Sequence, residues 1–568
     1  MCIKAMEKTL VSLDTETDGL HGELLGISFG REIDGELVCQ YLTPKTTNIR
    51  EKVLELYENH IPIFHNAKYD LQQLKRLGIP LPDEFHDTIL IAHLLGTDSM
   101  GLKDLAVKVL GVDPDEVKKI GKDFDVNNLS LINDTEEFQQ YAVNDASWTY
   151  QLFNELYPVL AKDKDLLRAY KFELKLVPVL ADMEDRGIEI DVDFLTELKK
   201  QVQQEMVDGQ TKLYKLAGEV FNLQSPKQLK EVFARKFGVQ VPSTNRGTLR
   251  SLLRRIKGRK GYDDLQAFIN ELFEYKKRAK LVSTYMDNII AMLDEDNRLH
   301  GSFNQTGTAT GRLSSSAPNM QNMPAHDEWG YRKAFRASKG HKLVVADYSQ
   351  IELRVLAHFS GDLTMIEAFR SGVDLHSTTA KKLFDLDCPV EEVKEKYPER
   401  RSFAKTINFG IVYGMSAKAL AEQVGVTEHQ AEQFIKNYFY NFFMVKGFIE
   451  QTRKFAQYYG YVPTMSGRKR WLDLNDYKWV RQSVNTRIQG SAADIMKKAM
   501  IELYRKLQTL GDEAHILLQV HDEIVVEVPE NKAEYYKTVI LDVLNDIVKL
   551  EVPITAEADI GDTWWEAK

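Results

Sequence analysis

The stretch Lys342-Leu-Val-Val-Ala-Asp347 decides the fold of the larger part of this chain, because a short apolar strand ends there in a carboxylate. A second segment, Ile516–Val528, predicts a hairpin that folds at His521 and Asp522. Between the two, from about Ile351 to Leu510, the apolar periodicity is mostly helical. Strands that lie far apart in sequence and both end in carboxylates predict one sheet with helices inserted between its strands, which is an α+β domain.

The chain up to about residue 155 has a different pattern, in which short strands alternate with helices. Thr9–Leu13 predicts a strand and Leu24–Phe29 its hairpin partner, and helical patterns follow at Leu54–Tyr57, Leu71–Leu77 and Phe138–Tyr157. These elements predict an α/β unit. Further helical patterns are found at Leu166–Gln204, broken at Arg186-Gly187, and at Leu265–Leu293.

Composition favours a globular protein of several domains. The chain has 568 residues, of which 43% are hydrophobic and 28% charged. No apolar run approaches the roughly 20 residues that a membrane helix needs, and no signal peptide begins the chain, so we expect no membrane partner. Three widely spaced cysteines (Cys2, Cys39, Cys388) predict neither a disulfide framework nor a metal cluster. We expect a reducing compartment, the cytoplasm of a bacterial or a phage-infected cell.

One segment is strongly basic although the net charge is −10. Between Arg246 and Lys260 there are seven cations and no acid, with Arg254 and Arg255 at the centre. A solvated charged face is one interpretation. A polyanion partner is the better one, because seven like charges repel one another unless something neutralises them.

Three short acidic motifs occur in order within the α/β unit. Asp14-Thr15-Glu16 ends the first strand, and because side chains alternate along a strand, both carboxylates point to one face. Asn66 and Asp70, and likewise Tyr141 and Asp145, are four apart and share a helix face. Hydrolysis of a phosphodiester by two divalent ions needs such oxygen ligands, which magnesium prefers.

These motifs resemble the exonuclease motifs of the proofreading superfamily whose members carry the acids Asp-Glu-Asp-Asp. The resemblance implies that Asp14 bridges two ions, that Glu16 and Asp145 bind one of them, and that Asp70 binds the other. It implies that Tyr141 orients the attacking water. The expected fold is a ribonuclease H-like mixed sheet, and the expected substrate is the 3′ end of single-stranded DNA.

Four longer motifs follow. They are Thr308-Ala-Thr-Gly-Arg-Leu-Ser-Ser-Ser-Ala-Pro-Asn-Met-Gln-Asn-Met-Pro324, Asp347-Tyr-Ser-Gln-Ile-Glu-Leu-Arg354, Arg401-Ser-Phe-Ala-Lys405-Thr-Ile-Asn-Phe409-Gly-Ile-Val-Tyr413-Gly414 and Gln519-Val-His-Asp522-Glu523. They resemble family A DNA polymerases, in the form of the Klenow fragment. The resemblance implies a 3′→5′ exonuclease domain at 1–155 and a right-hand polymerase domain at 156–568. Within it we expect a thumb at about 175–312, a palm at about 313–355 and 480–568, and fingers at about 356–479.

The resemblance also implies the roles of residues in the polymerase site. Asp347 and Asp522 would share two magnesium ions, for which manganese can substitute, and Glu523 would either bind metal or lie behind the ligands. The alternative is that Asp347 starts a helix and that Asp522 only forms a turn. His376, Gln350 and Glu352 would contact the nucleotide.

A helix face carries further nucleotide contacts. Arg401, Lys405, Phe409 and Tyr413 recur every four residues and drift by about 40° per step, so they share one broad face of a helix. The resemblance implies that the two cations bind the triphosphate, with Lys405 as proton donor to pyrophosphate, and that the two aromatic rings contact sugar and base. A core stripe would explain the rings but not the cations.

Primer-template DNA would be held by polar side chains. The residues that match the DNA contacts of the family are Arg312, Asn319, Gln321, Arg481, Asn485 and Gln489. Hydrogen-bond donors suit the minor groove, where every base pair presents acceptors, and a polymerase must accept all sequences alike.

Glu352 has two interpretations. Ser349-Gln-Ile-Glu352 has the spacing of a capping box, in which Glu accepts from a backbone N–H at a helix start. The family resemblance instead makes Glu352 a steric gate, which fills the space beside the sugar C2′ and excludes a ribose hydroxyl.

The sequence therefore predicts a monomeric DNA-directed DNA polymerase that proofreads and uses dNTPs. A nuclease fused to a non-catalytic DNA-binding module would lack Asp347, Asp522 or Lys405, and an RNA-synthesising relative would lack Glu352 and the four exonuclease acids. Because the chain begins almost at the first strand, we expect no 5′-nuclease domain. A phage replicative enzyme and a stand-alone repair enzyme both fit.

Overall fold

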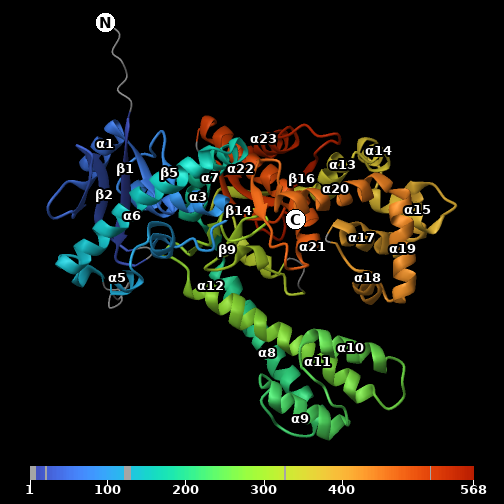
Figure 1. The fold of residues 1–568 in the computed structure, drawn as a ribbon. Helices are drawn as coiled ribbons and strands as arrows, with labels where there is room; N and C mark the ends of the chain where they lie inside the picture. Colours follow the sequence, from blue (N-terminus) through green and yellow to red (C-terminus); the bar gives the residue numbers. More distant parts are fainter. Residues whose placement is uncertain (1–7, 20–21, 120–128, 325–327, 413, 512) are drawn as a thin grey trace. The chain divides into compact units, whose positions relative to one another are not determined.

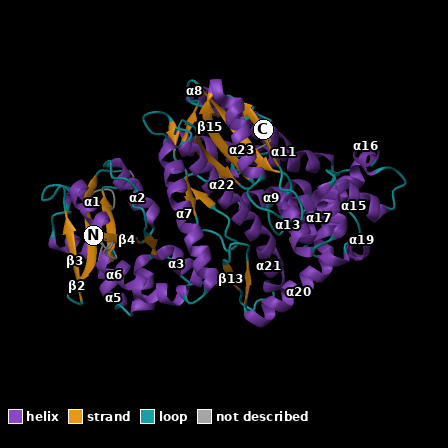
Figure 2. Cartoon of the chain, turned by 90° about the horizontal axis from the view of Figure 1, so that it is seen from above, coloured by secondary structure: helices purple, strands orange, loops and turns teal. Residues whose placement is uncertain are grey.

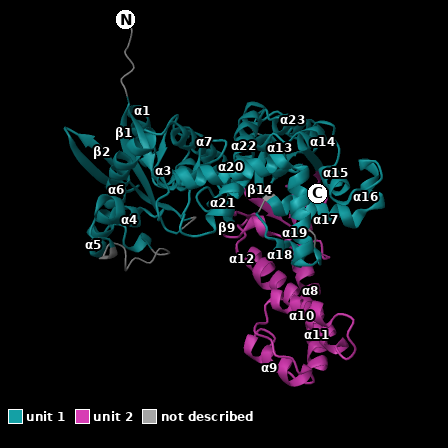
Figure 3. Ribbon diagram, turned by 45° about the vertical axis from the view of Figure 1, so that its right-hand side comes forward, with its two compact units in different colours: residues 1–186, 302–316, 344–559 teal, residues 187–301, 317–343, 560–568 magenta. Residues whose placement is uncertain are grey.

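A computed structural model describes residues 8–19, 22–119, 129–324, 328–412, 414–511 and 513–568. The chain forms two compact units, coloured separately in Figure 3. Unit 1 comprises residues 1–186, 302–316 and 344–559, and unit 2 comprises residues 187–301, 317–343 and 560–568. Unit 1 contains the predicted exonuclease domain and fingers, whereas unit 2 contains most of the predicted thumb. The domain borders proposed above remain predictions.

The N-terminal part of unit 1 is built on a five-stranded mixed sheet of order β3-β2-β1-β4-β5 (Figure 1). β1 pairs antiparallel with β2 and parallel with β4. The strands are β1 (Thr9–Thr17), β2 (Leu24–Ile33), β3 (Glu36–Leu42), β4 (His60–Phe64) and β5 (His86–Asp87). Both faces of β1 are largely buried, because helices from this unit pack on the sheet. The predicted α/β unit and its first hairpin are confirmed.

The helices of this part include four that lie where the periodicity predicts them and three, Thr88–Leu95, Leu102–Leu105 and Pro114–Lys119, that it did not predict. They are α1 (Ile49–Asn59), α2 (Ala67–Arg76), α3 (Thr88–Leu95), α4 (Leu102–Leu105), α5 (Pro114–Lys119), α6 (Glu136–Ala161) and α7 (Lys164–Arg186). Leu152 and Phe153 of α6 join Val11 and Leu13 of β1 in one buried cluster. This contact fixes the position of α6 against β1, which brings their acidic residues together.

A second sheet, most of whose residues belong to unit 1, has the order β14-β15-β11-β16, and it confirms the predicted union of distant strands. Its strands are β11 (His341–Tyr348), β14 (His515–Val520), β15 (Glu523–Pro529) and β16 (Ala556–Gly561). β14 and β15 form an antiparallel hairpin that turns at His521 and Asp522, as predicted. Figure 2 shows the strands of this sheet in orange among purple helices.

The region between β11 and β14 is mostly helical, as predicted. Its helices are α13 (Ile351–Ser360), α14 (Leu363–Arg370), α15 (Leu375–Phe384), α16 (Val393–Lys396), α17 (Pro398–Val412), α18 (Ala417–Val424), α19 (Glu428–Asn441), α20 (Phe443–Tyr459), α21 (Trp479–Asn485) and α22 (Ser491–Thr509), and α23 (Ala533–Asn545) follows the hairpin. The helical prediction missed a small hairpin, β12 (Tyr461–Pro463) with β13 (Lys469–Trp471), whose strands are too short to give a period. Another short pair joins β8 (Ser302–Asn304) to β9 (Ser314–Ser316).

Unit 2 is mainly helical. It contains α8 (Val192–Ala217), α9 (Pro226–Phe237), α10 (Arg246–Ile256), α11 (Asp263–Lys280) and α12 (Asp287–Ala291), with a small sheet of β6 (Ile188–Ile190), β7 (Arg298–Leu299) and β10 (Phe335–Arg336). The predicted helix break at Arg186-Gly187 is confirmed. Gly187 has φ +59°, and a Cβ there would lie 2.7 Å from the Leu299 carbonyl oxygen, so only glycine fits the turn into β6.

Candidate active sites

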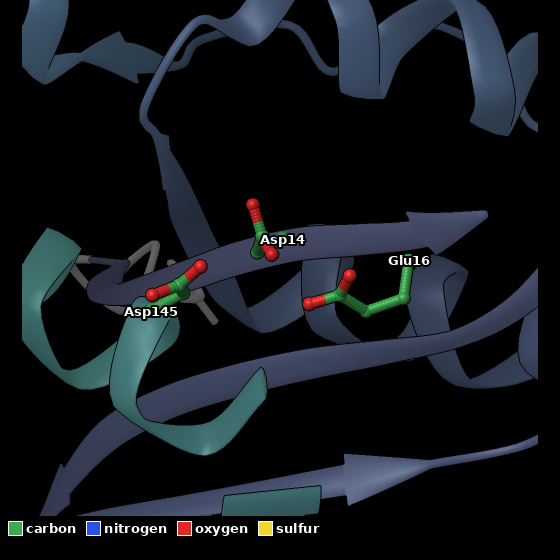
Figure 4. Close-up of side chains that lie close together, drawn as sticks. All are labelled: Asp14, Glu16 and Asp145. Carbon is green, nitrogen blue, oxygen red and sulfur yellow. The ribbon is translucent and has the colours of Figure 1, made fainter. Parts of the chain in front are cut away.

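Three carboxylates meet beside the first strand. Asp14 and Glu16 project from the same face of β1, and Asp145 reaches them from α6 (Figure 4). One oxygen from each lies within 4.8 Å of the others, a spacing that a single metal ion can bridge. The structure thus brings together residues that are separated by about 130 positions in the chain.

The electrostatics of this cluster favour a cation. Burial, followed by the neighbouring carboxylates, raises the pKa of Glu16 to about 8. The same causes hold the pKa of Asp14 well above its usual range, and burial raises that of Asp145 to about 6. Glu16 Oε1 and Asp145 Oδ1 are buried and accept no hydrogen bond. Unpaired buried carboxylate oxygens are costly, so the donor set fits a hard divalent ion that would neutralise them.

Asp70 lies next to this cluster but is held differently. From α2, its Oδ1 accepts hydrogen bonds from the backbone N and the Oγ1 of Thr15, at 2.9 and 2.7 Å. Burial raises its pKa to about 7, although the bonds from Thr15 oppose the rise. Asp70 is therefore held against β1 at Thr15, close enough for its charge to raise the pKa of Asp14.

Two residues near this cluster were missed from sequence. Asp87, buried at the start of α3, accepts hydrogen bonds from the backbone N of Asn66 and of Ala67, at 3.0 and 2.9 Å. It thereby fixes the first turn of α2, and its N-cap position before an apolar helix is a signal that sequence could have given. Lys103 Nζ lies 4.4 Å from the centroid of the Tyr141 ring. Its charge lowers the pKa of both Glu16 and Asp145, and no sequence pattern marks it.

The second pair of carboxylates lies on adjacent strands of the other sheet. Asp347 is exposed near the end of β11, and Asp522 follows His521 in the hairpin turn. The backbone N of Tyr348 donates to the Asp522 carbonyl at 3.0 Å, which joins the two strand ends. Burial raises the pKa of Asp522, and the nearby Arg312 and His521 oppose this. Glu523 is buried as the first residue of β15.

The interpretation of Asp347 as a helix-start residue is wrong. Asp347 lies within β11, and α13 begins only at Ile351, after the N-cap residue Gln350 with φ 53°. The capping box is also wrong. The backbone N–H that Glu352 would have to accept, that of Ser349, donates instead to the Thr555 carbonyl at 2.9 Å. The helix begins one residue later than the capping box requires, so the side chain of Glu352 does not pair with the backbone N–H of Ser349.

Glu352 pairs with Arg312. The side chain of Glu352 is 5% exposed and its Oε1 accepts from Nη2 of Arg312. The same guanidinium lies 3.8 Å from Asp522 Oδ1. Arg312, predicted as a DNA contact, thus links the proposed gate to one of the proposed metal ligands. That link is visible only in the folded chain.

The face of α17 that is predicted to contact the nucleotide is not the face that packs into the core. The buried residues of the helix include Ala404, Ile407, Asn408, Gly410 and Ile411, whereas Lys405 is exposed. Phe409 is half-buried, with its ring 5.7 Å from that of His376. Tyr413 lies outside the described residues. The alternative interpretation of this face as core therefore does not fit the packing of Lys405 and Phe409.

Arg401 and His376 already have protein partners. Arg401 Nε donates to Asp374 Oδ2 at 2.6 Å, and Asp374 also caps α15 by accepting from the backbone N of Ser377. Asn408 Nδ2 donates to His376 Nδ1 at 3.0 Å, and burial lowers the pKa of His376 to about 4. Asp374 thus orients Arg401, a role that its position two residues before His376 did not reveal.

The proposed minor-groove residues follow one helix. Arg481, Asn485 and Gln489 are spaced by four along α21 and the π-helical turn Thr486–Gly490 that continues it. Asn485 Oδ1 and Gln350 Oε1 are buried without a hydrogen-bond partner, so both are available to a ligand.

The other proposed DNA contacts lie in unit 2. Asn319 accepts from the backbone N of Gln321 at 3.0 Å and caps a short 3₁₀ turn. Arg254 and Arg255 are exposed in the last turn of α10, whose opposite side buries Leu249, Leu252 and Ile256. This amphipathic helix fits both interpretations of the basic segment.

Two family models match the chain. The model of DNA polymerase family A matches residues 192–566, and that of a 3′-5′ exonuclease matches residues 1–161. The first match covers more than half of the chain. The chain belongs to DNA polymerase family A. Both matches cover the regions in which the two carboxylate sites lie.

Similar proteins in family A include DNA polymerase I of Chloroflexus aurantiacus, which is 35% identical over 98% of this chain and 61% of its own length. The thermostable DNA polymerase I of Thermus filiformis is 41% identical over 76% of the chain and 52% of its own length. The chain thus spans about six tenths or less of these relatives. A solved structure, the POL domain of Pol1 from M. smegmatis in complex with DNA primer-template and dNTP, has a TM-score of 0.84 and 31% identity, and the match covers 98% of this chain and 95% of that one. These similarities confirm the predicted family and fold class.

Among the described residues, no helix is long and apolar enough to cross a membrane.

Proposed function

We propose that this chain synthesises DNA from dNTPs on a template and removes mismatched 3′ ends by 3′→5′ hydrolysis. The proposal is carried by the cluster of Asp14, Glu16 and Asp145, and by Asp347 and Asp522 on neighbouring strand ends, each in a region that matches the corresponding family model. The relative from M. smegmatis binds primer-template DNA and dNTP, which supports the same partners here.

Each site has the ligands for magnesium, for which manganese can substitute. Asp14, Glu16, Asp145 and Asp70 would hold two ions in the exonuclease site, and Asp347 and Asp522 would hold two in the polymerase site. The bound ions would lower the pKa of the attacking water or primer hydroxyl and neutralise charge that develops on phosphorus.

In the exonuclease site the protein itself positions the water and the scissile end. Tyr141 would direct the water with its hydroxyl, and its ring is held by Lys103, which lies 4.4 Å away. Lys103 also keeps Glu16 and Asp145 closer to their ionised forms. The 3′ end of single-stranded DNA would bring a phosphodiester within reach of this site.

In the polymerase site α17 would receive the nucleotide. Arg401 would exchange Asp374 for triphosphate oxygens, and Lys405 would donate a proton to pyrophosphate. Phe409 would lie against the sugar and Glu352 beside its C2′. Arg312, Asn485 and Gln489 would hold the primer-template by its minor groove. Glu523, buried as the residue that follows Asp522, would support that ligand rather than bind metal.

We further propose that the protein acts as a monomer in the cytoplasm, in replication or in repair. The test of the function uses two variants. Asp14→Ala with Glu16→Ala should abolish degradation of single-stranded primer and leave primer extension near wild type. Asp522→Ala should do the reverse. A matched loss of both activities in either variant, while circular dichroism remains unchanged, would contradict two independent sites.

A further inference from the structure

In unit 1, α20 lies next to the β12–β13 hairpin (Figure 2), and aromatic rings from both elements contact one another where they meet. Phe455 and Tyr459 of α20 have ring centroids 4.5 Å apart, and Tyr458 lies 4.7 Å from Tyr459. Tyr459 continues to Tyr461 of β12 at 6.0 Å, and Tyr461 to Trp471 of β13 at 5.2 Å. Tyr461 and Trp471 are direct cross-strand partners, so the pairing of the hairpin itself holds the last two rings together. We call these five residues the aromatic row.

The aromatic row is not part of a core. Tyr458 is 82% exposed, Tyr459 53% and Trp471 44%. Contiguous apolar surface of this kind is costly in water and marks an interaction site more often than a lone exposed ring does. The row therefore needs an occupant that covers flat aromatic faces.

The charges around the row are mixed and do not form a site for a ligand held mainly by its phosphates. Lys469 Nζ lies 4.4 Å from the Tyr461 ring centroid but is paired with Asp163. Lys478 is paired with Asp476 at 2.8 Å, and Asp473 is exposed nearby. The local charge is mixed, so binding here has to come from the rings. Unpaired nucleic-acid bases provide such flat faces, and they stack on aromatic side chains without regard to sequence.

The row is continuous with the proposed DNA surface. Arg453 of α20 donates from Nε to the Val480 carbonyl at 3.3 Å, next to Arg481. Arg470 of β13 donates from Nη1 to Thr486 Oγ1 at 2.8 Å, next to Asn485. The elements that carry the row are thus bonded directly to the helix that carries the minor-groove residues. A DNA strand that leaves that helix without a base-paired partner can continue onto the rings.

We propose that the aromatic row is a stacking platform for the single-stranded template ahead of the duplex. The inference rests on the proposed polymerase function, because only a template-directed enzyme holds such a strand. The structure assigns the bases to Tyr458 and Tyr459, which are the most exposed rings, and Tyr461 and Trp471 extend the platform along the hairpin.

The test compares two DNA ligands by fluorescence anisotropy, a blunt duplex and the same duplex with a single-stranded thymidine extension on the template 5′ end. The variant is Tyr458→Ser with Tyr459→Ser, which leaves Trp471 and its hydrogen bond to the Leu94 carbonyl in place. The control is Tyr440→Ser, because Tyr440 is 85% exposed on α19, outside the row. In the double variant, the gain in affinity that the extension gives over the blunt duplex should be about tenfold smaller than in the wild type. The control should lose none.

Because stacking rather than ion pairing is responsible, the affinity gained from the extension should change little with salt, whereas binding of the blunt duplex should weaken steeply. An unchanged ratio of the two affinities in the double variant would overturn the proposal. A double variant that keeps this ratio but no longer self-associates in sedimentation would also overturn the proposal, since the rings would then form a contact between protein molecules. Primer extension by the wild-type chain on the same DNA checks the polymerase function separately.

Discussion

Replacement of Glu352 distinguishes a gate that acts by volume from one that acts by charge. Its side chain is 5% exposed and pairs with Arg312, whose guanidinium is also 3.8 Å from Asp522 Oδ1. Glu352→Ala removes both the volume and the charge, whereas Glu352→Gln keeps the volume and removes only the charge. If Glu352 fills the space beside the sugar C2′, Ala should admit ribonucleotides and Gln should not.

The magnitude follows from the burial. A ribose hydroxyl forced into this space without a partner costs roughly 1–3 kcal/mol. This corresponds to about 5- to 150-fold in selectivity at 1.4 kcal/mol per factor of ten. Loss of the carboxylate also leaves Arg312 without its closest partner. Because Arg312 is partly exposed and Asp522 remains near it, we expect a loss of stability below the roughly 3–5 kcal/mol of a fully buried pair.

The assay is steady-state incorporation of matched ribo- and deoxyribonucleotides by wild type, Glu352→Ala and Glu352→Gln, together with their melting temperatures. We expect Glu352→Gln to select deoxyribonucleotides nearly as well as the wild type and Glu352→Ala to select them far less well. Equal relaxation by Gln and Ala would show that the charge and Arg312 determine selectivity instead of volume. Full selectivity in the Ala variant would refute the gate.

Four further perturbations test other parts of the reasoning. Lys103→Met should raise the magnesium concentration for half-maximal exonuclease activity by about 10-fold or more, because its charge favours ionised ligands, and Lys103→Arg should not. Phe409→Tyr should make dideoxynucleotide incorporation markedly easier, since a ring hydroxyl can replace the missing sugar hydroxyl; chain termination assays on both proteins would show it, and equal termination would remove Phe409 from the nucleotide site. Arg254→Ala with Arg255→Ala should flatten the log–log salt dependence of duplex binding by roughly one to two units; an unchanged slope would make the segment a solvated face. Burial lowers the pKa of His86 from 6.5 to about 4, so its contribution to stability is complete above pH 6.5 and is lost as pH falls toward 4. At pH 5 the loss is about 2 kcal/mol, and His86→Phe should shrink the fall in urea midpoint between pH 7 and pH 5; an equal fall in both proteins would contradict this assignment.

Sequence determined the elements and the identity of most candidate residues. Alternation along β1 is enough to place Asp14 and Glu16 on one face, because side-chain direction in a strand depends only on local geometry. The hairpin at His521 and Asp522 and the break at Gly187 were also predictable, because a turn and a helix break depend on the local backbone. Ordered motifs then identified the family, although they gave no contacts.

Local patterns failed where a distant partner competes for the same group. Ser349 and Glu352 have the spacing of a capping box, but the Ser349 N–H is taken by Thr555, which lies about 200 residues further along the chain. Propensity near a helix start amounts to about 1 kcal/mol. A backbone hydrogen bond to Thr555 and the ion pair of Glu352 with the partly exposed Arg312 outweigh it.

The sequence by itself therefore determined that this chain has two acidic sites in an α/β unit and an α+β domain, because periodicity and motif order are properties of the local chain. Only the tertiary structure decided which side chains act together. Lys103 beside Tyr141, Asp374 on Arg401 and Arg312 between Glu352 and Asp522 are contacts between segments that no spacing rule connects. They form because burial of the intervening cores brings these segments together, and that packing energy is spread over the whole fold rather than written in any one motif.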